Sequence, residues 1–392
     1  MKIAMICFDF NDLNLRKQPW RYVYEVARGL KARGHEVRLL TDDSKGTTLS
    51  PEVPVLSVNR LLTPLKGESR ELITALEREN PDRVIMLLGL TSFLRIRFEI
   101  KQPVVGILTS SVYSLREIIK NVGVRDLIRY HRYTLIHVLN SLVPSFFVRK
   151  WSKKFRYIVV LSQKNRERLI KKGVPPEKVV VIPPGIDEEF LELPERETIE
   201  RIRYEISPEG DPIIMYYTSP LTLRGTDTVV RALPKILEVK RVKLLILSRP
   251  DYRSVLKEEQ KLMRIARKLK VEENLVLISK NLSPQEVKAY VGSADVVALP
   301  FKLVLSDVPL SILEAMALGK VVAGTDVDGI PEILEDRGLI VRANSPEDLA
   351  MKIISVLEDE TLRNELEEKA AEYVRNWPRW RDTVERMEEL IT

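Results

Sequence analysis

Short apolar runs alternate with helical patterns along the second half of the chain, and this alternation limits the possible folds more than any other feature. Strands connected through helices pair in parallel, and helices then cover both faces of the sheet. Ligands of such sheets bind beyond the carboxyl ends of the strands. The predicted strands are Ile213–Tyr217, Leu244–Leu247, Leu275–Ile278, Val296–Leu299, Val321–Ala323 and Leu339–Val341, and the predicted helices are Thr226–Val239, Ser254–Leu269, Pro284–Gly292, Leu310–Leu318 and Pro346–Leu357.

The first half has the same pattern, beginning with the strand Lys2–Cys7, a helix over Pro19–Arg33 and the strand Glu36–Thr41. Further buried strands are predicted over Val53–Val58, Arg83–Leu87, Val104–Leu108 and Tyr157–Leu161. At 392 residues the chain is too long for one ordinary hydrophobic core. We therefore expect two α/β domains, each with its own parallel sheet.

The segment Ser306–Glu332 carries the first indication of a binding site. Apolar residues recur at helical spacing from Leu310, Gly319 is placed to end this helix, and a second helix start follows at Gly329. Two helix N-termini at neighbouring ends of a parallel sheet would present free N–H groups that suit a diphosphate. Glu314 lies one turn into the first helix, where its carboxylate can accept hydrogen bonds from ribose hydroxyls. The other interpretation is ordinary α/β packing with a surface glutamate.

The same segment resembles that of a known family. LPFKLVLSDVPLSILEAMALGKVVAGTDVDGIPEIL is similar to the donor-binding segment of retaining GT-B glycosyltransferases of family 4 (glycosyl transferases group 1), which carries E-A-M-A followed by G-G-x-P-E. The resemblance implies that Glu314 holds the ribose of a nucleotide. It also implies that the backbone at Pro309, Leu310 and Ser311 holds the diphosphate.

The resemblance extends over nearly the whole chain and implies the GT-B fold, in which two Rossmann-like parallel-sheet domains face a central cleft. The family's hinge sequence, I-P-N-G-x-D, is similar to IPPGID at residues 182–187. The resemblance implies an acceptor-binding domain over residues 1–184 and a nucleotide-sugar-binding domain over residues 185–375. The C-terminal helix, residues 376–392, is expected to pack back on the first domain.

The loop after the strand Ile213–Tyr217 resembles the family's phosphate clamp, G-R-L-x-x-x-K-G. Aligned on Gly225, this chain has Arg224 at the lysine position and Ser219 at the arginine position. A fixed guanidinium binds phosphate in a bidentate manner and stabilises the charge that a departing nucleoside diphosphate gains. We therefore predict a catalytic role for Arg224 and one hydrogen bond from Ser219 to the donor. The alternative for Arg224 is a surface arginine.

Other positions depart from the family pattern near the expected reaction centre. Thr109 stands at a strand end where many members have a histidine, and Ser110 beside it is a candidate contact for the acceptor or a phosphate. A hydroxyl cannot act as a base near neutral pH as imidazole can, so the catalytic role at Thr109 differs from that of a histidine. Ser306 replaces the first glutamate of the family's pair as a donor-binding residue. Next to it, Asp307 either hydrogen-bonds the donor sugar in a catalytic role or caps the following helix.

Two loops also differ from the glycine-rich turns of the family. The sequence LRKQ at residues 15–18 stands in place of a Gly-Gly pair, and its Lys17 is a candidate contact for phosphate or acceptor. A solvated loop lysine is the other interpretation. The sequence SRP at residues 248–250 replaces a second such turn, near the expected position of the nucleotide base.

Charge is divided unevenly between the two halves. Residues 1–184 contain 33 Lys and Arg against 17 Asp and Glu, a net +16, whereas the remainder has 30 against 39, a net −9. These opposite signs favour a functional basic face on the first domain. Residues 127–166 contain no acidic residue and interleave apolar and aromatic residues with cations. Two interpretations remain for residues 127–154: a core helix with a basic connector, or a face that docks on an anionic membrane surface.

Composition disfavours several classes of protein and of site. A single cysteine, Cys7, excludes a disulfide framework, and three histidines argue against a histidine-built metal site. We therefore expect no metal and no cofactor, because the nucleotide sugar is a co-substrate. Neither a signal peptide nor an apolar run of about 20 residues is evident, so we expect a cytoplasmic protein, with peripheral association at the inner face of the cell membrane as an option. The 30% charged content is typical of thermophile proteins, and no nucleic-acid module is recognised.

These features predict a retaining, metal-independent glycosyltransferase of the hexosyltransferase type. It would move a sugar from a nucleotide-sugar donor to a hydroxyl of a lipid-linked or otherwise anionic glycan acceptor. Two alternatives stay open. Residues missing from the family pattern at Thr109, Ser219 and Ser306 allow a non-catalytic binding protein, and the fold also allows a sugar-nucleotide epimerase.

Overall fold

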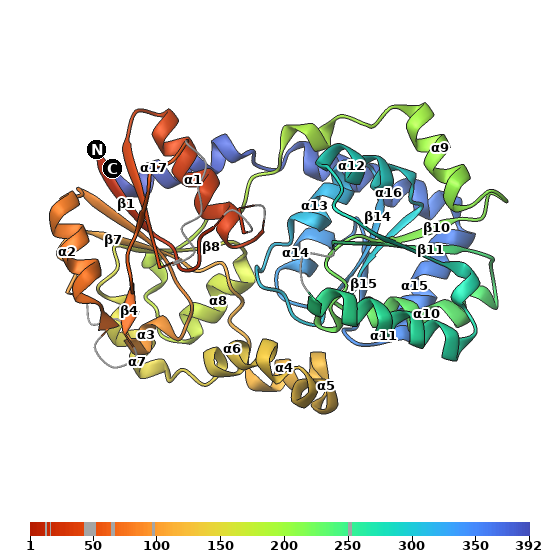
Figure 1. Cartoon of the computed structure of the whole chain (residues 1–392), viewed down its shortest axis with the longest axis horizontal. Coiled ribbons are helices and arrows are strands. Elements are labelled where there is room, and N and C mark those ends of the chain that lie inside the picture. The colour runs from red at the N-terminus through yellow and green to blue at the C-terminus, as the bar shows by residue number, and fades with distance from the viewer. Residues whose placement is uncertain (12–13, 16, 43–51, 64–66, 96–98, 250–252) are drawn as a thin grey trace.

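A computed structural model of the chain describes residues 1–11, 14–15, 17–42, 52–63, 67–95, 99–249 and 253–392. They form two α/β domains that lie beside each other along the long axis of the molecule (Figure 1). The chain passes between the domains near residue 185 and again near residue 378, where it returns to the first domain.

The first sheet has seven parallel strands in the order β3-β2-β1-β6-β7-β8-β9. In register, Ile3 of β1 lies between Val37 and Arg83. The strands are β1 (Lys2–Ile6), β2 (Glu36–Thr41), β3 (Val55–Ser57), β6 (Arg83–Leu87), β7 (Val104–Ile107), β8 (Tyr157–Val160) and β9 (Val179–Val181), with β4 (Leu62–Thr63) and β5 (Gly67–Glu68) as a separate antiparallel pair. The helices are α1 (Trp20–Ala32), α2 (Arg70–Glu79), α3 (Ser92–Arg95), α4 (Leu115–Val122), α5 (Val124–Arg129), α6 (His131–Ser141), α7 (Ser145–Ser152), α8 (Gln163–Lys171) and the 3₁₀ helix η1 (Pro176–Lys178).

The second sheet has six parallel strands in the order β12-β11-β10-β13-β14-β15. The strands are β10 (Ile213–Tyr216), β11 (Lys243–Ser248), β12 (Leu275–Ser279), β13 (Val296–Leu299), β14 (Val321–Thr325) and β15 (Leu339–Val341). The helices are α9 (Arg196–Ile206), α10 (Thr226–Leu237), α11 (Arg253–Leu269), α12 (Pro284–Ser293), α13 (Leu310–Ala317), α14 (Ile330–Leu334), α15 (Pro346–Glu358), α16 (Glu360–Arg375) and α17 (Trp380–Ile391). Three 3₁₀ helices, η2 (Glu188–Leu191), η3 (Thr222–Arg224) and η4 (Glu272–Asn274), lie in the connections.

The central strands are apolar along their whole length because helices cover both faces of each sheet. Every residue from Ile3 to Ile6 in β1 is at most 1% exposed, and the four residues of β13 are fully buried. Such strands cannot be recognised by alternation of polar and apolar residues, but their short apolar runs between turns predict them well. The prediction of two parallel-sheet α/β domains is confirmed.

The C-terminal helix α17 packs on α1 of the first domain, and the two chain ends lie close together in Figure 1. Gly29 of α1 permits this contact, because a Cβ there would lie 2.4 Å from a methyl carbon of Val384. At the crossing, Thr383 Oγ1 donates to the carbonyl of Pro183 at 3.0 Å, and Trp377 Nε1 donates to that of Pro184 at 2.8 Å. Gly185 is required here, since a Cβ would lie 2.2 Å from the backbone nitrogen of Trp380.

Residues 188–200, which are rich in glutamate, contain η2 and the start of α9, and Phe190 and the following Ile202 bury against the second domain. One segment differs from an interpretation based on sequence. The core helix, one of the two interpretations for residues 127–154, is instead divided among α5, α6 and α7. Pro144 precedes α7 in an extended conformation and ends the helical run, as its ring requires.

Candidate functional site

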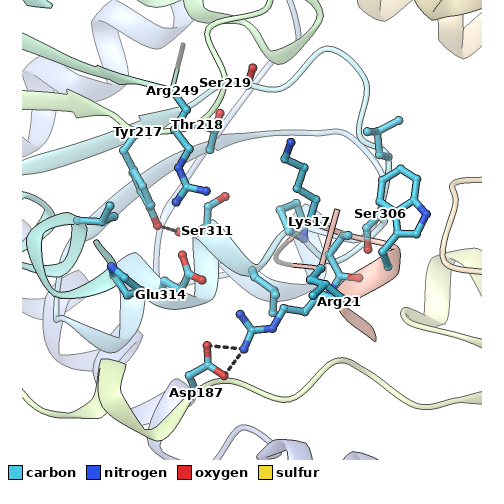
Figure 2. A pocket seen from close by; sticks show the side chains of 18 of the residues that line it. Lys17, Arg21, Asp187, Tyr217, Thr218, Ser219, Arg249, Ser306, Ser311 and Glu314 are labelled. Carbon is cyan, nitrogen blue, oxygen red and sulfur yellow. Dashed lines mark hydrogen bonds and ion pairs between the residues drawn. The ribbon is translucent and has the colours of Figure 1, made fainter. Parts of the chain in front are cut away.

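A cavity of about 1170 Å³ opens between the two domains, beyond the carboxyl ends of β10, β11, β12 and β13. Its walls come from the loop before α1, from α1 itself, from α6, from the hinge around Asp187 and from the loops of the second domain. Figure 2 labels ten of these residues, among which Lys17, Arg21 and Arg249 are the cations. Eight of the predicted site residues line this cavity: Lys17, Ser219, Arg224, Ser306, Pro309, Leu310, Ser311 and Glu314.

The N-terminus of α13 forms one wall of the cavity. Pro309 is its N-cap residue and no side chain caps the helix, so the first N–H groups of α13 have no partner within it. Leu310 and Ser311 bring these groups to the cavity, together with the positive end of the helix dipole. Gly319, at φ +66°, follows the last residues of the helix, as predicted. This end of α13 has the chemistry of an anion site.

Glu314 lies one turn further along α13 and also lines the cavity. Burial raises the pKa of its carboxyl to about 7, with a further increase from the negative charge of Asp187. Arg21 and Arg249 oppose this shift. Figure 2 shows the guanidinium of Arg249 extending toward Ser311 and Glu314. The carboxyl group therefore loses its proton near neutral pH. In the ionised form both of its oxygens accept hydrogen bonds and neither donates one.

Arg224 ends η3 and reaches the cavity from the loop after β10. Burial lowers the pKa of its guanidinium, and this side chain forms no ion pair with any residue in the described part of the chain. The following Gly225 has φ +79°, and a Cβ on it would lie 1.8 Å from the carbonyl oxygen of Pro300. Glycine thus lets this loop press against the loop that leads to α13, which brings Arg224 into the same cavity as the helix N-terminus.

Several polar contacts at this cavity were not anticipated from sequence. Arg21 donates two hydrogen bonds to Asp187, at 2.7 and 3.0 Å, and contacts Glu25 at 3.1 Å, while Trp380 Nε1 donates to Asp187 at 3.0 Å. This cluster ties α1, the hinge and α17 together at the edge of the cavity. Tyr217, directly after β10, donates its hydroxyl hydrogen to the carbonyl of Ser311. The position of Asp187 in the IPPGID sequence was the one available signal.

Three predicted residues, Thr109, Ser110 and Asp307, do not line the cavity. The backbone N–H of Asp307 donates to the carbonyl of Thr109 at 3.1 Å, and this bond turns the aspartate side chain toward the first domain. Its Oδ2 accepts a 2.6 Å hydrogen bond from Ser162. Of the two interpretations of Asp307, the helix cap is wrong, since Pro309 is the N-cap residue of α13 and no side chain caps this helix. The carbonyl of Ser110 accepts from the side chain of Asn165.

The second predicted helix start, at α14, also faces away from the cavity. A Cβ on Gly329 would lie 2.6 Å from the carbonyl oxygen of Asp307, so this end packs tightly at the domain interface. Glu332 of α14 accepts hydrogen bonds from the backbone N–H groups of Gln163 and Lys164, at 3.0 and 2.6 Å. The expected cradle of two helix N-termini is therefore wrong, because of these two helix starts only that of α13 lines the cavity. Arg16 and Pro250, in the two loops that depart from glycine-rich turns, lie outside the described residues.

Across the described part of the chain, no group of three or more His, Cys, Asp or Glu side chains is arranged to hold a metal ion. Cys7 is buried, and burial raises the pKa of its thiol. No helix among the described residues has the length and apolar character needed to cross a membrane.

Both halves of the chain match models of known protein families. Residues 20–190 match the family model Glycosyltransferase Family 4, and residues 198–375 match the family model Glycosyl transferases group 1. Among curated proteins, the chain is similar to D-inositol 3-phosphate glycosyltransferase of Corynebacterium aurimucosum, with 25% identity over 100% of this chain and 95% of the relative.

Solved structures give the same result for the fold. Sucrose-phosphate synthase of Thermosynechococcus elongatus superposes with a TM-score of 0.76 at 16% identity, covering 100% of this chain and 98% of the other. HepE of Anabaena, in complex with UDP and glucose, superposes with a TM-score of 0.71 at 15% identity, covering 99% and 98%. The two family models together span most of the chain, and the solved structures share its two-domain architecture. The two halves of the chain therefore match two glycosyltransferase family models, and its fold is GT-B.

Proposed function

We propose that this glycosyltransferase is a retaining, metal-independent enzyme of the hexosyltransferase type that takes its sugar from a nucleotide-sugar donor. One observation carries the proposal: the uncapped N-terminus of α13, Glu314 one turn later and the guanidinium of Arg224 line the same interdomain cavity. These groups match a diphosphate, a ribose and the charge of a leaving group. The structure of HepE with UDP and glucose supports a nucleotide-sugar donor for this fold.

In the proposed reaction, the bond between the anomeric carbon and the diphosphate oxygen breaks first. The helix dipole of α13 and Arg224 stabilise the negative charge that the diphosphate gains. An acceptor hydroxyl then attacks the anomeric carbon from the face that the diphosphate leaves, which retains the configuration. The departing diphosphate oxygen takes the proton of this hydroxyl, so no protein base is needed. Among the described residues, no cluster of metal ligands lies in the cavity.

We assign the acceptor to the first domain, as a lipid-linked or otherwise anionic molecule. The net charge of +16 over residues 1–184 favours a negatively charged partner. Lys17, Arg21 and Arg28 bring cations from this domain to the cavity wall. The name of the relative D-inositol 3-phosphate glycosyltransferase contains a phosphorylated molecule, which is consistent with such an acceptor.

Helices α5 to α7 support a peripheral position on an anionic membrane surface at the cytoplasmic side. In α6, Thr134 and His137 face inward, whereas large apolar side chains face solvent. Cations on α5 and α7, such as Arg129 and Lys150, flank this apolar face and can pair with anionic lipid headgroups. The exposed apolar residues of the face are Val124, Ile128, Leu135, Ile136, Leu139, Leu142 and Phe146.

A thermal-shift panel tests the donor assignment. UDP-, GDP- and ADP-linked sugars are added to the purified chain, and a ligand that binds only the folded form raises the melting temperature. We expect one nucleotide class to give a clear shift, and product analysis with that donor to give a glycoside of retained configuration. Absence of a shift with every nucleotide sugar contradicts the proposal. An isomerised nucleotide sugar, formed without acceptor, identifies an epimerase instead.

A further inference from the structure

Three polar side chains on the cavity wall lack hydrogen-bond partners in the described part of the chain. They are Gln18, which precedes α1, His137 of α6 and Ser306 of the loop before α13. Both amide atoms of Gln18, Nδ1 of His137 and Oγ of Ser306 are enclosed and unpaired. Their side chains all belong to the one cavity that also holds the predicted donor groups.

Enclosed polar groups without partners are uncommon in native proteins, because each loses its hydrogen bonds to water. Three such groups around one cavity therefore call for a ligand with several neutral hydrogen-bonding groups. His137 is 5% exposed and Ser306 is 4% exposed, so both side chains are largely shielded from bulk water. Sugar hydroxyls, which both donate and accept, meet this need.

His137 and Ser306 are linked through Tyr113. The rings of His137 and Tyr113 pack edge to face, with centroids 5.7 Å apart. The hydroxyl of Tyr113 accepts a 3.1 Å hydrogen bond from the backbone N–H of Val304, two residues before Ser306. This chain of contacts crosses from the first domain to the loop before α13. It therefore fixes the position of His137 relative to that loop.

The charge state of His137 suits a neutral ligand group. Burial lowers the pKa of its imidazole to about 4, so the ring is neutral at physiological pH and carries one donor and one acceptor nitrogen. Burial is the only cause of this shift, and no neighbouring charge among the described residues contributes to it. Such a ring matches a hydroxyl better than a phosphate, which attracts cations instead.

Ser306 lies away from the predicted nucleotide site. In Figure 2, Ser306 is seen on the opposite side of the cavity from Glu314 and Arg249. Figure 2 shows Lys17, the residue before Gln18 in the sequence, between Ser306 and these two residues. With the ribose at Glu314 and the diphosphate at the start of α13, the sugar of a nucleotide sugar would extend toward Ser306.

We propose that Gln18, His137 and Ser306 form a subsite that binds hydroxyl groups of the transferred sugar. This inference rests on the proposed function and adds the residues that recognise the sugar as distinct from the nucleotide. It separates the cavity into a charged part, for the diphosphate, and a neutral part, for the sugar.

Calorimetry with UDP and UDP-glucose tests the subsite, or with GDP or ADP and the matching sugar if the thermal-shift panel selects those. The variants are Gln18→Leu, His137→Phe and Ser306→Ala, which keep size but remove hydrogen bonds. We expect each to weaken nucleotide-sugar binding by about three- to tenfold, the effect of one hydrogen bond, while nucleoside diphosphate binding stays within twofold. The control is His131→Phe, an exposed histidine of the same helix that does not line the cavity.

The possible outcomes separate the two proposals. If the variants keep the wild-type preference for UDP-glucose over UDP, the sugar hydroxyls bind elsewhere and the subsite is wrong, although the proposed function stands. Equal loss of both ligands shows a structural role and also overturns the subsite. If the wild-type chain binds no nucleotide sugar at all, the proposed function fails and the subsite with it. Should His137→Phe fail to fold, Gln18→Leu and Ser306→Ala decide the question.

Discussion

The hydroxyl of Ser162 donates a 2.6 Å hydrogen bond to Oδ2 of Asp307, and this bond joins the two domains. Ser162 is also the N-cap residue of α8, whose next two N–H groups donate to Glu332 of the second domain. The carboxylate of Glu332 in one domain thus accepts from the N-terminus of a helix in the other, and Asp307 accepts from the residue that caps this helix. The two domains are therefore in direct contact beside the cavity. This contact holds the side chain of Asp307 away from the cavity.

Ser162→Ala is expected to lower the free energy of unfolding by about 2 kcal/mol or more, because it removes a helix cap and leaves a buried carboxyl without its donor. Chemical denaturation measures this change. Ser114→Ala is the matched control, since Ser114 caps α4 but forms no bond to the second domain, and only about 1 kcal/mol should be lost there. Equal losses in both variants would mean that the interdomain bond contributes nothing.

Arg224→Ala is expected to reduce turnover by about 10²- to 10³-fold, the usual effect of removing one group that stabilises a developing negative charge. Donor binding should change much less, because the N-terminus of α13 remains. Initial rates at saturating donor, together with calorimetry, separate the two effects. Arg196→Ala, an exposed arginine of α9 remote from the cavity, should behave as wild type. Unchanged turnover in Arg224→Ala would contradict the assigned role.

Glu314→Gln is expected to remove a pH dependence. With a pKa of about 7, the carboxyl is protonated at pH 6 and ionised at pH 8, where both oxygens accept ribose hydroxyls. Affinity for the nucleoside diphosphate should therefore rise between pH 6 and 8 in the wild type more than in the variant. Calorimetry at several pH values, with the same ligand for both proteins, measures the difference. Parallel pH profiles would exclude Glu314 as a ribose ligand.

The same carboxyl should affect stability in the opposite sense. Because its pKa is raised above the ordinary 4.5, the folded state favours the protonated form, and this contribution is present below pH 4.5 and lost as pH rises through 7. Glu314→Gln, which cannot ionise, should gain about 1–3 kcal/mol relative to wild type between pH 4 and pH 8. Denaturation at both pH values checks the sign, and a variant that loses ground at pH 8 would refute it.

The apolar face of α5 to α7 predicts binding to anionic vesicles. Ile128→Glu and Phe146→Glu place negative charge on this face and should reduce co-sedimentation with anionic phospholipid vesicles by about tenfold, because both burial and attraction are lost. Leu193→Glu is the control, since Leu193 is 72% exposed in the second domain. Binding that is equal on neutral vesicles, or unchanged in both variants, would rule out this face as an electrostatic membrane contact.

Local patterns in the sequence determined the elements. The strands Glu36–Thr41, Arg83–Leu87, Val296–Leu299 and Leu339–Val341 were predicted with the bounds that the structure has. Each is a short apolar run between turn signals, and such runs depend little on distant residues. For the same reason the start of α13 and the position of Glu314 one turn into it could be read from the chain, and both line the cavity.

Tertiary structure decided which polar residues meet in the cavity. Asp307 and Ser306 are adjacent in sequence, yet only Ser306 lines the cavity, because the bond from Asp307 to the Thr109 carbonyl turns the aspartate into the interface. His137 carried no motif, and its burial in the cavity wall follows from packing on Tyr113, 24 positions earlier. Local periodicity fixes where a helix or strand forms, whereas the direction of a single side chain depends on contacts between residues far apart in sequence.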